Sequence, residues 1–263
     1  MVKYLKIAKK VVKEAGKILK ENLSREMKVE YKGEVNLVTS QDKLSQEIIY
    51  QKLSSLFLEH DFLAEEELEK IKGSEFRWII DPLDGTTNYA HRFPIFCVSI
   101  ALEYRGKVIL GTIYNPMLDE LFWAVKGEGA FLNNKPIKVS STQELDKSLL
   151  ATGFPYDLRE SEENNINHFN NFLVRTQAIR RCGSAALDLC YVACGRFDGF
   201  WELKLFPWDL AAGILIVEEA GGRISDFRDK EVNIYAKEIV ASNGLIHQQM
   251  IEVLDLENYS VKK

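Results

Sequence analysis

Residues 78–88 read Trp-Ile-Ile-Asp-Pro-Leu-Asp-Gly-Thr-Thr-Asn, and this stretch joins an apolar run to a cluster of polar side chains. The apolar start predicts a buried strand. Pro82 then fixes its own φ angle, and Gly85 permits a sharp change in backbone direction. We therefore expect a turn that brings the carboxylates of Asp81 and Asp84 to one side of the chain.

Two neighbouring carboxylates favour a site for divalent cations, because each raises the pKa of the other unless cations lie between them. Hard oxygen ligands suit Mg²⁺, Mn²⁺ or Ca²⁺ better than zinc. Gly85, Thr86 and Thr87 follow with backbone N–H groups and hydroxyls, which suit an anion such as phosphate. Together these groups predict metal-assisted hydrolysis of a phosphoester.

The chain has 263 residues and a formal net charge of −5. This length suits one large domain or two small ones that share a core. The mild negative charge argues against a nucleic-acid-binding surface. No apolar stretch approaches the ~20 residues of a membrane-crossing helix, and the Lys-rich start lacks the apolar segment of a signal peptide. We therefore expect a cytoplasmic protein with no membrane partner.

The cysteines show no metal-binding spacing, and we expect Cys97, Cys182, Cys190 and Cys194 to be buried, reduced thiols. The segment from Cys190 to Arg196 formally matches the Cys-x₅-Arg loop of cysteine phosphatases. However, Cys190 follows an apolar helical pattern, and nothing nearby predicts a lowered thiol pKa. Core packing with a chance match is the favoured interpretation.

The histidines receive no catalytic role. His91 lies near the 81–88 motif, in a segment that we expect to continue as a short helix and loop. The contexts of the other three are polar or close to helix ends, so we expect surface positions for His60, His168 and His247.

The first half of the chain combines two helical patterns with a run of strands. Apolar residues at spacings of three and four from Leu5 to Leu23 predict an amphipathic helix that packs on the core. A second helix is expected from about Ser40 to Leu58. Short turns separate the strand-like segments, which predicts an antiparallel meander. The expected strands are 96–104, 107–114 and 121–125, with a turn region over 127–134.

The second half alternates strand and helix patterns, which is typical of an α/β unit. The polar segment 161–167 is expected to be an exposed loop. The expected strands are 149–151, 178–180, 197–202, 222–226 and 239–242, and the expected helices are 185–193, 210–220 and 245–254.

The segment Asp81-Pro-Leu-Asp-Gly-Thr-Thr-Asn resembles the signature of the inositol monophosphatase family, which consists of magnesium-dependent, lithium-sensitive phosphatases. Further segments resemble other motifs of this family in type and order, so the likeness extends from about Tyr4 to Asn243. These segments are 32–33 with 38–39 and Asp42, 64–67, 183–186, and 208–213 with 219–222. Ala64, Glu67 and Asn36 depart from the family pattern, and it stays open whether Glu65 or Glu66 faces inward.

The resemblance implies a metal site that holds two or three Mg²⁺ ions, for which Mn²⁺ can substitute. Four carboxylates and one backbone carbonyl would be the ligands, and Asp81 would bridge two ions. These ligands are Glu65, Asp81, Leu83, Asp84 and Asp209.

The resemblance also implies catalytic and substrate-binding residues. Glu65, Thr86 and Asp42 would act in catalysis, with Asp42 paired to Thr86 to help activate the attacking water. Gly85 and Thr86 would hold the phosphate. The residues that receive the rest of the substrate would be Asp84, Gly183, Ser184, Ala185, Glu202 and Asp209.

The implied fold is an α/β (α+β) sandwich with αβαβα layers, of the sugar-phosphatase type. Residues 1–145 would form an α+β half with an antiparallel sheet and most metal ligands. Residues 146–263 would form an α/β half that supplies Asp209 and the substrate wall, and the two halves would make one compact body. Members of the family are usually homodimers, so a homodimer is expected.

The implied reaction is direct attack of a Mg²⁺-activated water on inositol monophosphate or a related sugar phosphate, without a covalent intermediate. Glu202 favours a polyol, because a carboxylate accepts hydrogen bonds from hydroxyls. Lys204, Arg159 and Arg180 favour instead a second phosphate. The same scaffold also allows fructose-1,6-bisphosphatase or 3′(2′),5′-bisphosphate nucleotidase activity, or an additional protein-binding regulatory role.

One other phosphatase class has a similar motif. In haloacid-dehalogenase-type phosphatases, an apolar strand ends in Asp-x-Asp, and the first aspartate is the nucleophile. Here Asp81 and Asp84 are three residues apart, and Glu65 would have no role in that chemistry. The spacing therefore disfavours an aspartyl nucleophile.

Overall fold

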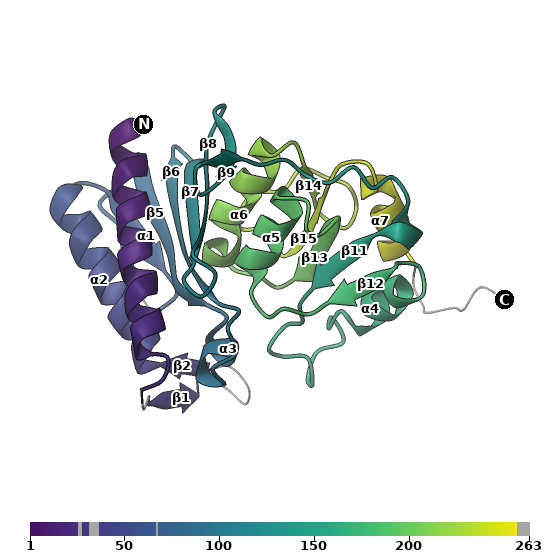
Figure 1. Ribbon diagram of the computed structural model, residues 1–263, viewed down its shortest axis with the longest axis horizontal. Coiled ribbons are helices and arrows are strands. Elements are labelled where there is room, and N and C mark those ends of the chain that lie inside the picture. The colour runs from purple at the N-terminus through teal and green to yellow at the C-terminus, as the bar shows by residue number, and fades with distance from the viewer. Residues whose placement is uncertain (26–27, 32–36, 67, 257–263) are drawn as a thin grey trace.

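A computed structural model describes residues 1–25, 28–31, 37–66 and 68–256 of the chain. These residues form five layers, in the order helices, eight-stranded sheet, helices, five-stranded sheet, helices (Figure 1). The predicted αβαβα sandwich is therefore confirmed. No helix in this described part of the chain is both long and apolar enough to cross a membrane.

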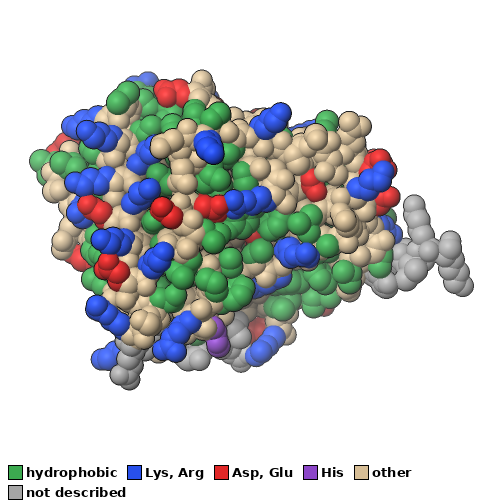
Figure 2. Space-filling model, in the orientation of Figure 1, with side chains coloured by type: hydrophobic (Ala, Val, Ile, Leu, Met, Phe, Trp, Pro, Cys, Tyr) green, Lys and Arg blue, Asp and Glu red, His purple; other side chains and the backbone are tan. Residues whose placement is uncertain are grey.

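The first layer consists of α1 (Val2–Asn22) and α2 (Ser40–Leu56). The apolar stripe predicted for the first helix is buried against the eight-stranded sheet. Its outer face carries lysines with acids among them (Figure 2), including exposed i,i+4 pairs. Such pairs add little stability, so the apolar face is what holds α1 in place.

The eight-stranded sheet has the order β10-β9-β8-β7-β6-β5-β3-β4. The predicted meander is present from β5 to β10. The sheet is not wholly antiparallel, however, because β3 pairs with β5 in parallel. Its strands are β3 (Asp61–Ala64), β4 (Leu68–Lys70), β5 (Phe76–Asp84), β6 (Cys97–Tyr104), β7 (Lys107–Asn115), β8 (Glu120–Val125), β9 (Gly129–Leu132) and β10 (Lys135–Pro136).

The strand β9 corrects the prediction of a turn over 127–134. Gly127, Gly129 and Asn133 all have the positive φ angles that are typical of turns, and they lie at or near the ends of the strand. Between them, Ala130 and Phe131 pair with β8, and the Phe131 ring stacks on Trp123 at 4.2 Å between ring centroids. Cross-strand packing therefore outweighs the local turn residues.

The five-stranded sheet is parallel on one side and antiparallel on the other, in the order β12-β11-β13-β15-β14. Every strand predicted for the second half is present within a few residues of its expected position. The strands are β11 (Leu149–Thr152), β12 (Ala178–Arg180), β13 (Gly199–Leu203), β14 (Arg223–Ser225) and β15 (Glu238–Ser242). A small separate ribbon pairs β1 (Val29–Tyr31) with β2 (Leu37–Thr39).

The outer layer of the second half contains one helix that the sequence did not predict. This helix, α4 (Ile166–Leu173), begins inside the segment expected to be a loop and packs beside α7 (His247–Leu254). Its asparagines have low helix propensity. Packing of Phe172 against Trp201, at 4.1 Å between ring centroids, supplies the stabilisation that the local sequence lacks.

The central layer consists of α5 (Ala185–Ala193) and α6 (Pro207–Glu219). Both helices are apolar on nearly all sides because sheets cover them from two directions. Gly111 lets β7 approach α6 closely, since a Cβ there would lie 2.8 Å from the Ala212 carbonyl oxygen. These contacts fix the position of α6, and its first turn carries Asp209.

Two of the histidine predictions are wrong. His60 is buried in an aromatic cluster with Phe57 and Phe76, and His247 is fully buried. The ring nitrogens of His247 lie 2.8 Å from the hydroxyls of Ser225 and Ser242. These partners come from other strands, so local sequence context did not reveal them.

All four cysteines are unpaired, with two buried and two half-buried. Cys190 lies within α5, and burial raises the pKa of its thiol. A cysteine-phosphatase loop requires the opposite, an accessible thiol with a lowered pKa. The structure therefore excludes this alternative.

Candidate active site

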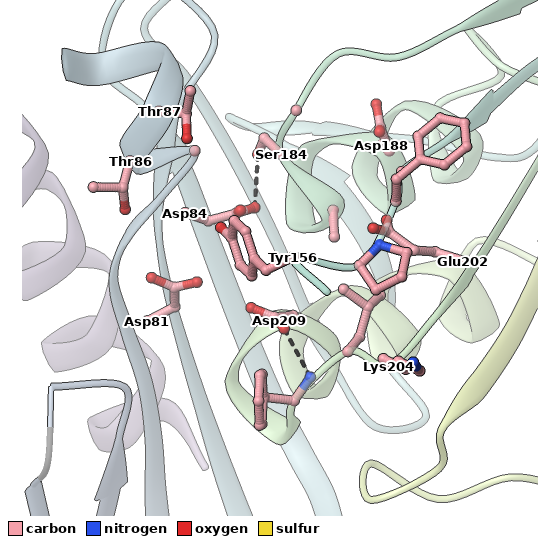
Figure 3. A pocket seen from close by; sticks show the side chains of 18 of the residues that line it. Asp81, Asp84, Thr86, Thr87, Tyr156, Ser184, Asp188, Glu202, Lys204 and Asp209 are labelled. Carbon is pink, nitrogen blue, oxygen red and sulfur yellow. Dashed lines mark hydrogen bonds between the residues drawn. The ribbon is translucent and has the colours of Figure 1, made fainter. Parts of the chain in front are cut away.

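A cavity of about 320 Å³ opens between the two halves of the molecule, and residues from both halves line it. It contains eleven of the twelve residues that the sequence assigned to the site, and Asp42 lies just behind it, bonded to Thr86. Figure 3 shows Asp81 and Thr86 on one side and Glu202 on the other. The eleven are Glu65, Asp81, Leu83, Asp84, Gly85, Thr86, Gly183, Ser184, Ala185, Glu202 and Asp209.

The end of β5 presents the two carboxylates of the predicted turn. Its pairing with β6 shifts register between Asp81 and Asp84, so the strand bulges at Pro82 and Leu83. The Leu83 N–H donates to Asp81 Oδ1 at 2.9 Å. From behind, the Ser45 hydroxyl of α2 donates to the Pro82 carbonyl at 2.7 Å. The bulge is thus held on both sides, and both carboxylates face the cavity.

Gly85 follows with a φ of 92°, a conformation that residues with a Cβ rarely adopt. A Cβ there would also lie 3.0 Å from the Ile95 carbonyl and 3.2 Å from that of Gly183. The turn leads directly into α3 (Thr86–Ala90). Glycine is therefore required both for the backbone conformation and for the close approach of the second half.

Thr86 and Asp42 form the hydrogen bond that the resemblance implied. The Thr86 Oγ1 lies 2.9 Å from Asp42 Oδ1 and 3.0 Å from the Leu83 carbonyl. Asp42 Oδ2 accepts from the N–H and the hydroxyl of Thr39, which caps α2. Burial raises the pKa of Asp42 to about 6, against the lowering effect of these hydrogen bonds. Asp42 is therefore poised to accept or share a proton near neutral pH.

Asp84 connects the two halves. Its Oδ2 accepts from the Ser184 hydroxyl at 2.6 Å and from the Ala186 N–H at 2.8 Å. The same hydroxyl caps α5 by accepting from the Leu187 N–H. Burial raises the pKa of Asp84 in spite of these donors. The first turn of α5 therefore sets the direction of this carboxylate.

Asp209 and Glu65 complete the set of acids. Asp209 Oδ2 accepts from the Phe206 N–H at 2.8 Å, which fixes the carboxylate at the start of α6. Glu65 lines the cavity directly after β3, whereas the backbone of Glu66 is bonded to the side chain of Gln46. The acid that faces inward is thus Glu65. The predicted loop residues 32, 33 and 36, and Glu67, lie outside the described residues.

The acids repel one another strongly. Burial raises the pKa of Asp81 well above its usual value, and the charges of Glu65, Asp84 and Asp209 raise it further. Burial and the charge of Asp84 likewise raise the pKa of Asp209. Among the described residues, no three His, Cys, Asp or Glu side chains lie close enough to hold a metal ion as they stand. The donor set nevertheless fits a hard divalent cation, which would offset this repulsion and draw the carboxylates together.

The opposite wall contains residues that the sequence analysis missed. Tyr156 and Asp188 line the cavity, and Glu202 lies below Asp188 in the view of Figure 3. Burial raises the pKa of Glu202 to about 8, and the neighbouring charge of Asp188 contributes. Gly153 leaves the space for the Glu202 carboxylate, because a Cβ there would lie 2.0 Å from its oxygen.

A signal for Asp188 was present in the sequence, since it is the only charged residue in the apolar 185–193 pattern. Tyr156 gave no such signal, because it lies in a connection without periodicity. Of the basic residues considered for a second phosphate, Lys204 lines the cavity, whereas Arg159 and Arg180 do not. The Lys204 ammonium donates to Asp157 and to Ser161, both at 2.7 Å.

Fold and site together define a metal-dependent phosphatase: acidic oxygen donors from both halves surround a cavity whose edge carries a Gly-Thr-Thr turn. The sequence pattern that describes the "Inositol monophosphatase family" matches residues 1–258. The chain belongs to this family and is a phosphatase of the inositol monophosphatase type. The aspartyl-nucleophile alternative is therefore set aside.

Curated relatives and solved structures agree with this assignment. Inositol monophosphatase 3 of Solanum lycopersicum is 43% identical, and the match covers 96% of each chain. The crystal structure of the suhB protein of Bartonella henselae superimposes with a TM-score of 0.91 at 39% identity, over 97% of this chain and 99% of the other. The structure of inositol monophosphatase from Anabaena (Nostoc) sp. PCC 7120 gives 0.88 at 43% identity, over 96% and 95%.

Two further matches bear on the metal and on an alternative function. An IMPase/NADP phosphatase, solved in complex with Mg²⁺ and phosphate, is 26% identical with a TM-score of 0.81, and 95% of each chain is covered. A relative from Salmonella typhimurium, 40% identical over 94% of each chain, is named Nus factor SuhB. The first of these supports the use of divalent metal ions in this fold.

Proposed function

We propose that the chain hydrolyses inositol monophosphate, or a closely related sugar phosphate, by direct attack of water. The observation that carries the proposal is the convergence of Glu65, Asp81, Asp84 and Asp209 on one cavity that also holds Thr86, with Asp42 behind it. The names of the most similar relatives support inositol phosphate as the substrate class.

Two or three Mg²⁺ ions are expected at the acids and at the Leu83 carbonyl, and Mn²⁺ is expected to replace them. Mg²⁺ bound there would lower the pKa of water and neutralise charge on the ester. The buried, mutually repelling acids support this part of the proposal, because they are costly without a counter-ion. The family resemblance further implies inhibition by lithium.

The chain's own residues provide positioning and proton transfer. Gly85 and Thr86 place backbone N–H donors at the phosphate end of the cavity. The Thr86 hydroxyl, bonded to Asp42, would orient the attacking water. With a pKa of about 6, Asp42 can share the proton that leaves that water. Ser184, Ala185 and Glu202 would contact the alcohol portion.

Two alternative functions stay open on the same scaffold. Lys204 favours a second phosphate, as in fructose 1,6-bisphosphate or adenosine 3′,5′-bisphosphate. The relative named Nus factor SuhB favours an additional protein-binding regulatory role. The first alternative would change the substrate and not the chemistry.

A substrate panel tests the proposal. We expect kcat/KM to be higher for inositol 1-phosphate than for fructose 1,6-bisphosphate or adenosine 3′,5′-bisphosphate. Excess EDTA should abolish phosphate release in all cases. A preference for the adenine compound would overturn the substrate, and release that resists EDTA would overturn the metal-dependent chemistry.

Asp84→Asn tests the metal site itself. The amide keeps the size of the side chain but loses the charge that a cation requires. We therefore expect activity to fall by more than about 100-fold. Substitution of a residue that only hydrogen-bonds to a metal ligand typically costs about 10- to 100-fold. The circular dichroism spectrum should stay that of the parent. Asp146→Asn, at an exposed acid outside the cavity, is the control. Near-normal turnover in Asp84→Asn would remove Asp84 from the site.

We further propose a homodimer in the cytoplasm. The unpaired cysteines support a reducing compartment. Light scattering coupled to size-exclusion chromatography would measure the mass, and a monomer at micromolar concentration would contradict the dimer.

A further inference from the structure

Asp188 is a buried acid in the cavity wall. It has no role in the proposed reaction or in the proposed metal site. It lies on α5, four residues beyond the cap Ser184, and both residues line the cavity. Its side chain is 1% exposed, yet Oδ1 has no hydrogen-bond partner. Buried polar atoms are nearly always bonded, so this oxygen requires an explanation.

Two other acids of the cavity wall have strong donors as partners. Asp84 accepts from Ser184 and Ala186, and Asp209 accepts from the Phe206 N–H. Near Asp188, the Cys182 thiol is only a weak donor. A buried acceptor without a donor destabilises the folded protein, and a ligand that brings a donor would remove this cost.

The position of Glu202 indicates what kind of ligand would donate a hydrogen bond to Asp188. Asp188 and Glu202 lie on the same side of the cavity, opposite Asp81 and Thr86 (Figure 3). This is the side away from the phosphate end, where the alcohol portion of an ester would lie. The negative charge of Asp188 raises the pKa of Glu202, which reflects how close the two carboxyls are.

We infer that Asp188 is a specificity-determining residue whose Oδ1 accepts a hydrogen bond from a hydroxyl of a polyol phosphate, beside the hydroxyls bound by Glu202. This inference rests on the proposed function and adds a second acceptor to the alcohol side of the cavity. Two carboxyls in one wall can receive neighbouring ring hydroxyls, which a single carboxyl binds less selectively.

A hydroxyl fits this position better than a charged group does. A second phosphate would add negative charge to a wall in which burial already raises the pKa of both acids. A positive charge is already present nearby, since Arg181 lines the cavity and partly offsets the rise that burial causes in the pKa of both acids. A hydroxyl supplies the missing donor and adds no net charge.

The experiment compares inositol 1-phosphate with cyclohexyl phosphate, which has the same ring and no hydroxyls, on the parent protein and on Asp188→Asn. The amide keeps the shape, but it carries no charge and leaves a single oxygen as hydrogen-bond acceptor. We expect KM for inositol 1-phosphate to rise about tenfold, which corresponds to about 1.4 kcal/mol. kcat for inositol 1-phosphate and both constants for cyclohexyl phosphate should stay within about twofold of the parent.

Asp198→Asn is the matched control. Asp198 is also a buried aspartate of the second half, but the Ser140 hydroxyl and the Leu149 N–H donate to it, and it lies outside the cavity. Its substitution should lower the melting temperature and leave the ratio of the two substrates unchanged. If Asp188→Asn does not fold, Asp188→Ser carries the same comparison.

The outcomes separate this inference from the function on which it rests. If the parent protein releases no phosphate from inositol 1-phosphate with Mg²⁺ present, the proposed function fails. If the parent is active and Asp188→Asn affects both esters equally, or neither, the role of Asp188 is overturned. A rise in KM confined to the hydroxylated ester supports it.

Discussion

The Thr86 hydroxyl has one proton and two acceptors, the Asp42 carboxylate and the Leu83 carbonyl. If the Leu83 carbonyl binds a cation, the proton stays with Asp42, and the lone pairs of Thr86 are free to accept from a water. Thr86 therefore couples the proposed metal ligands on β5 to the acid on α2. One hydroxyl serves both purposes because the chain turns sharply at Gly85.

Thr86→Val tests this coupling. Valine has nearly the same shape but no hydroxyl, so the water would lose its orientation and Asp42 would lose a donor. We expect kcat to fall roughly 100-fold, the lower range for proton-transfer groups, with little change in KM. Thr112→Val is the control, because Thr112 also donates to a backbone carbonyl but lies in β7. A loss of kcat in both variants would indicate general destabilisation.

Glu202 predicts how the stability of the metal-free protein depends on pH. Its pKa of about 8 lies above the ordinary value of 4.5, so between these values the folded state holds a proton that the unfolded state has lost. The free energy of unfolding should therefore fall as pH rises from about 5 to about 8. Thermal melts in EDTA across this range should show a shallower decline for Glu202→Gln. Equal slopes in both proteins would contradict the raised pKa.

Among the elements, the first turn of α5 matters most for the site, since it holds Asp84, a proposed metal ligand that belongs to the other half. Its cap, Ser184, binds Asp84 and the helix backbone at once. Asn88 adds a second connection, because its amide donates to the Ile95 and Cys182 carbonyls, both at 2.7 Å. The orientation of Asp84 thus depends on how α5 packs against β5 and α3.

Ser184→Ala should affect stability and metal affinity together. Loss of the cap costs about 1 kcal/mol of unfolding free energy. Loss of the hydrogen bond to Asp84 should raise the Mg²⁺ concentration for half-maximal activity about tenfold. Urea unfolding and a Mg²⁺ titration measure the two effects. Ser184→Thr keeps the hydroxyl and should restore both, whereas an unchanged Mg²⁺ requirement in Ser184→Ala would limit Ser184 to capping.

At the scale of the whole molecule, the acids belong to both halves, so a bound cation should hold the halves together. At 100 times its Kd, a ligand stabilises the folded state by about 2.7 kcal/mol. For a chain of this length we expect a rise of roughly 5–10 °C in melting temperature from EDTA to saturating Mg²⁺. Asp84→Asn should respond much less. Identical melting curves for the parent protein in the two conditions would argue against a site shared by the halves.

Several elements and the 81–88 motif could be predicted from the sequence because their signals are local, whereas the layered fold and most of the site were expected from the resemblance to the inositol monophosphatase family. The periodicity of α1, the turns of the meander and the 81–88 motif each lie within a short stretch of chain. The helix α4, the strand β9 and the buried positions of His60 and His247 could not be predicted. In each of these cases, partners distant in the sequence decide the outcome, such as Trp201 for α4 and Ser225 for His247.

The sequence by itself determined the class of chemistry, because acids, glycine and hydroxyls at fixed spacing specify a metal and phosphate site wherever the chain places them. Only the tertiary structure placed Asp188 beside Glu202 in the wall opposite that site. Asp188 and Glu202 come from α5 and β13, and they meet in one wall because two sheets enclose the central helices. Contacts of this kind depend on how whole layers pack, and no local pattern records that packing.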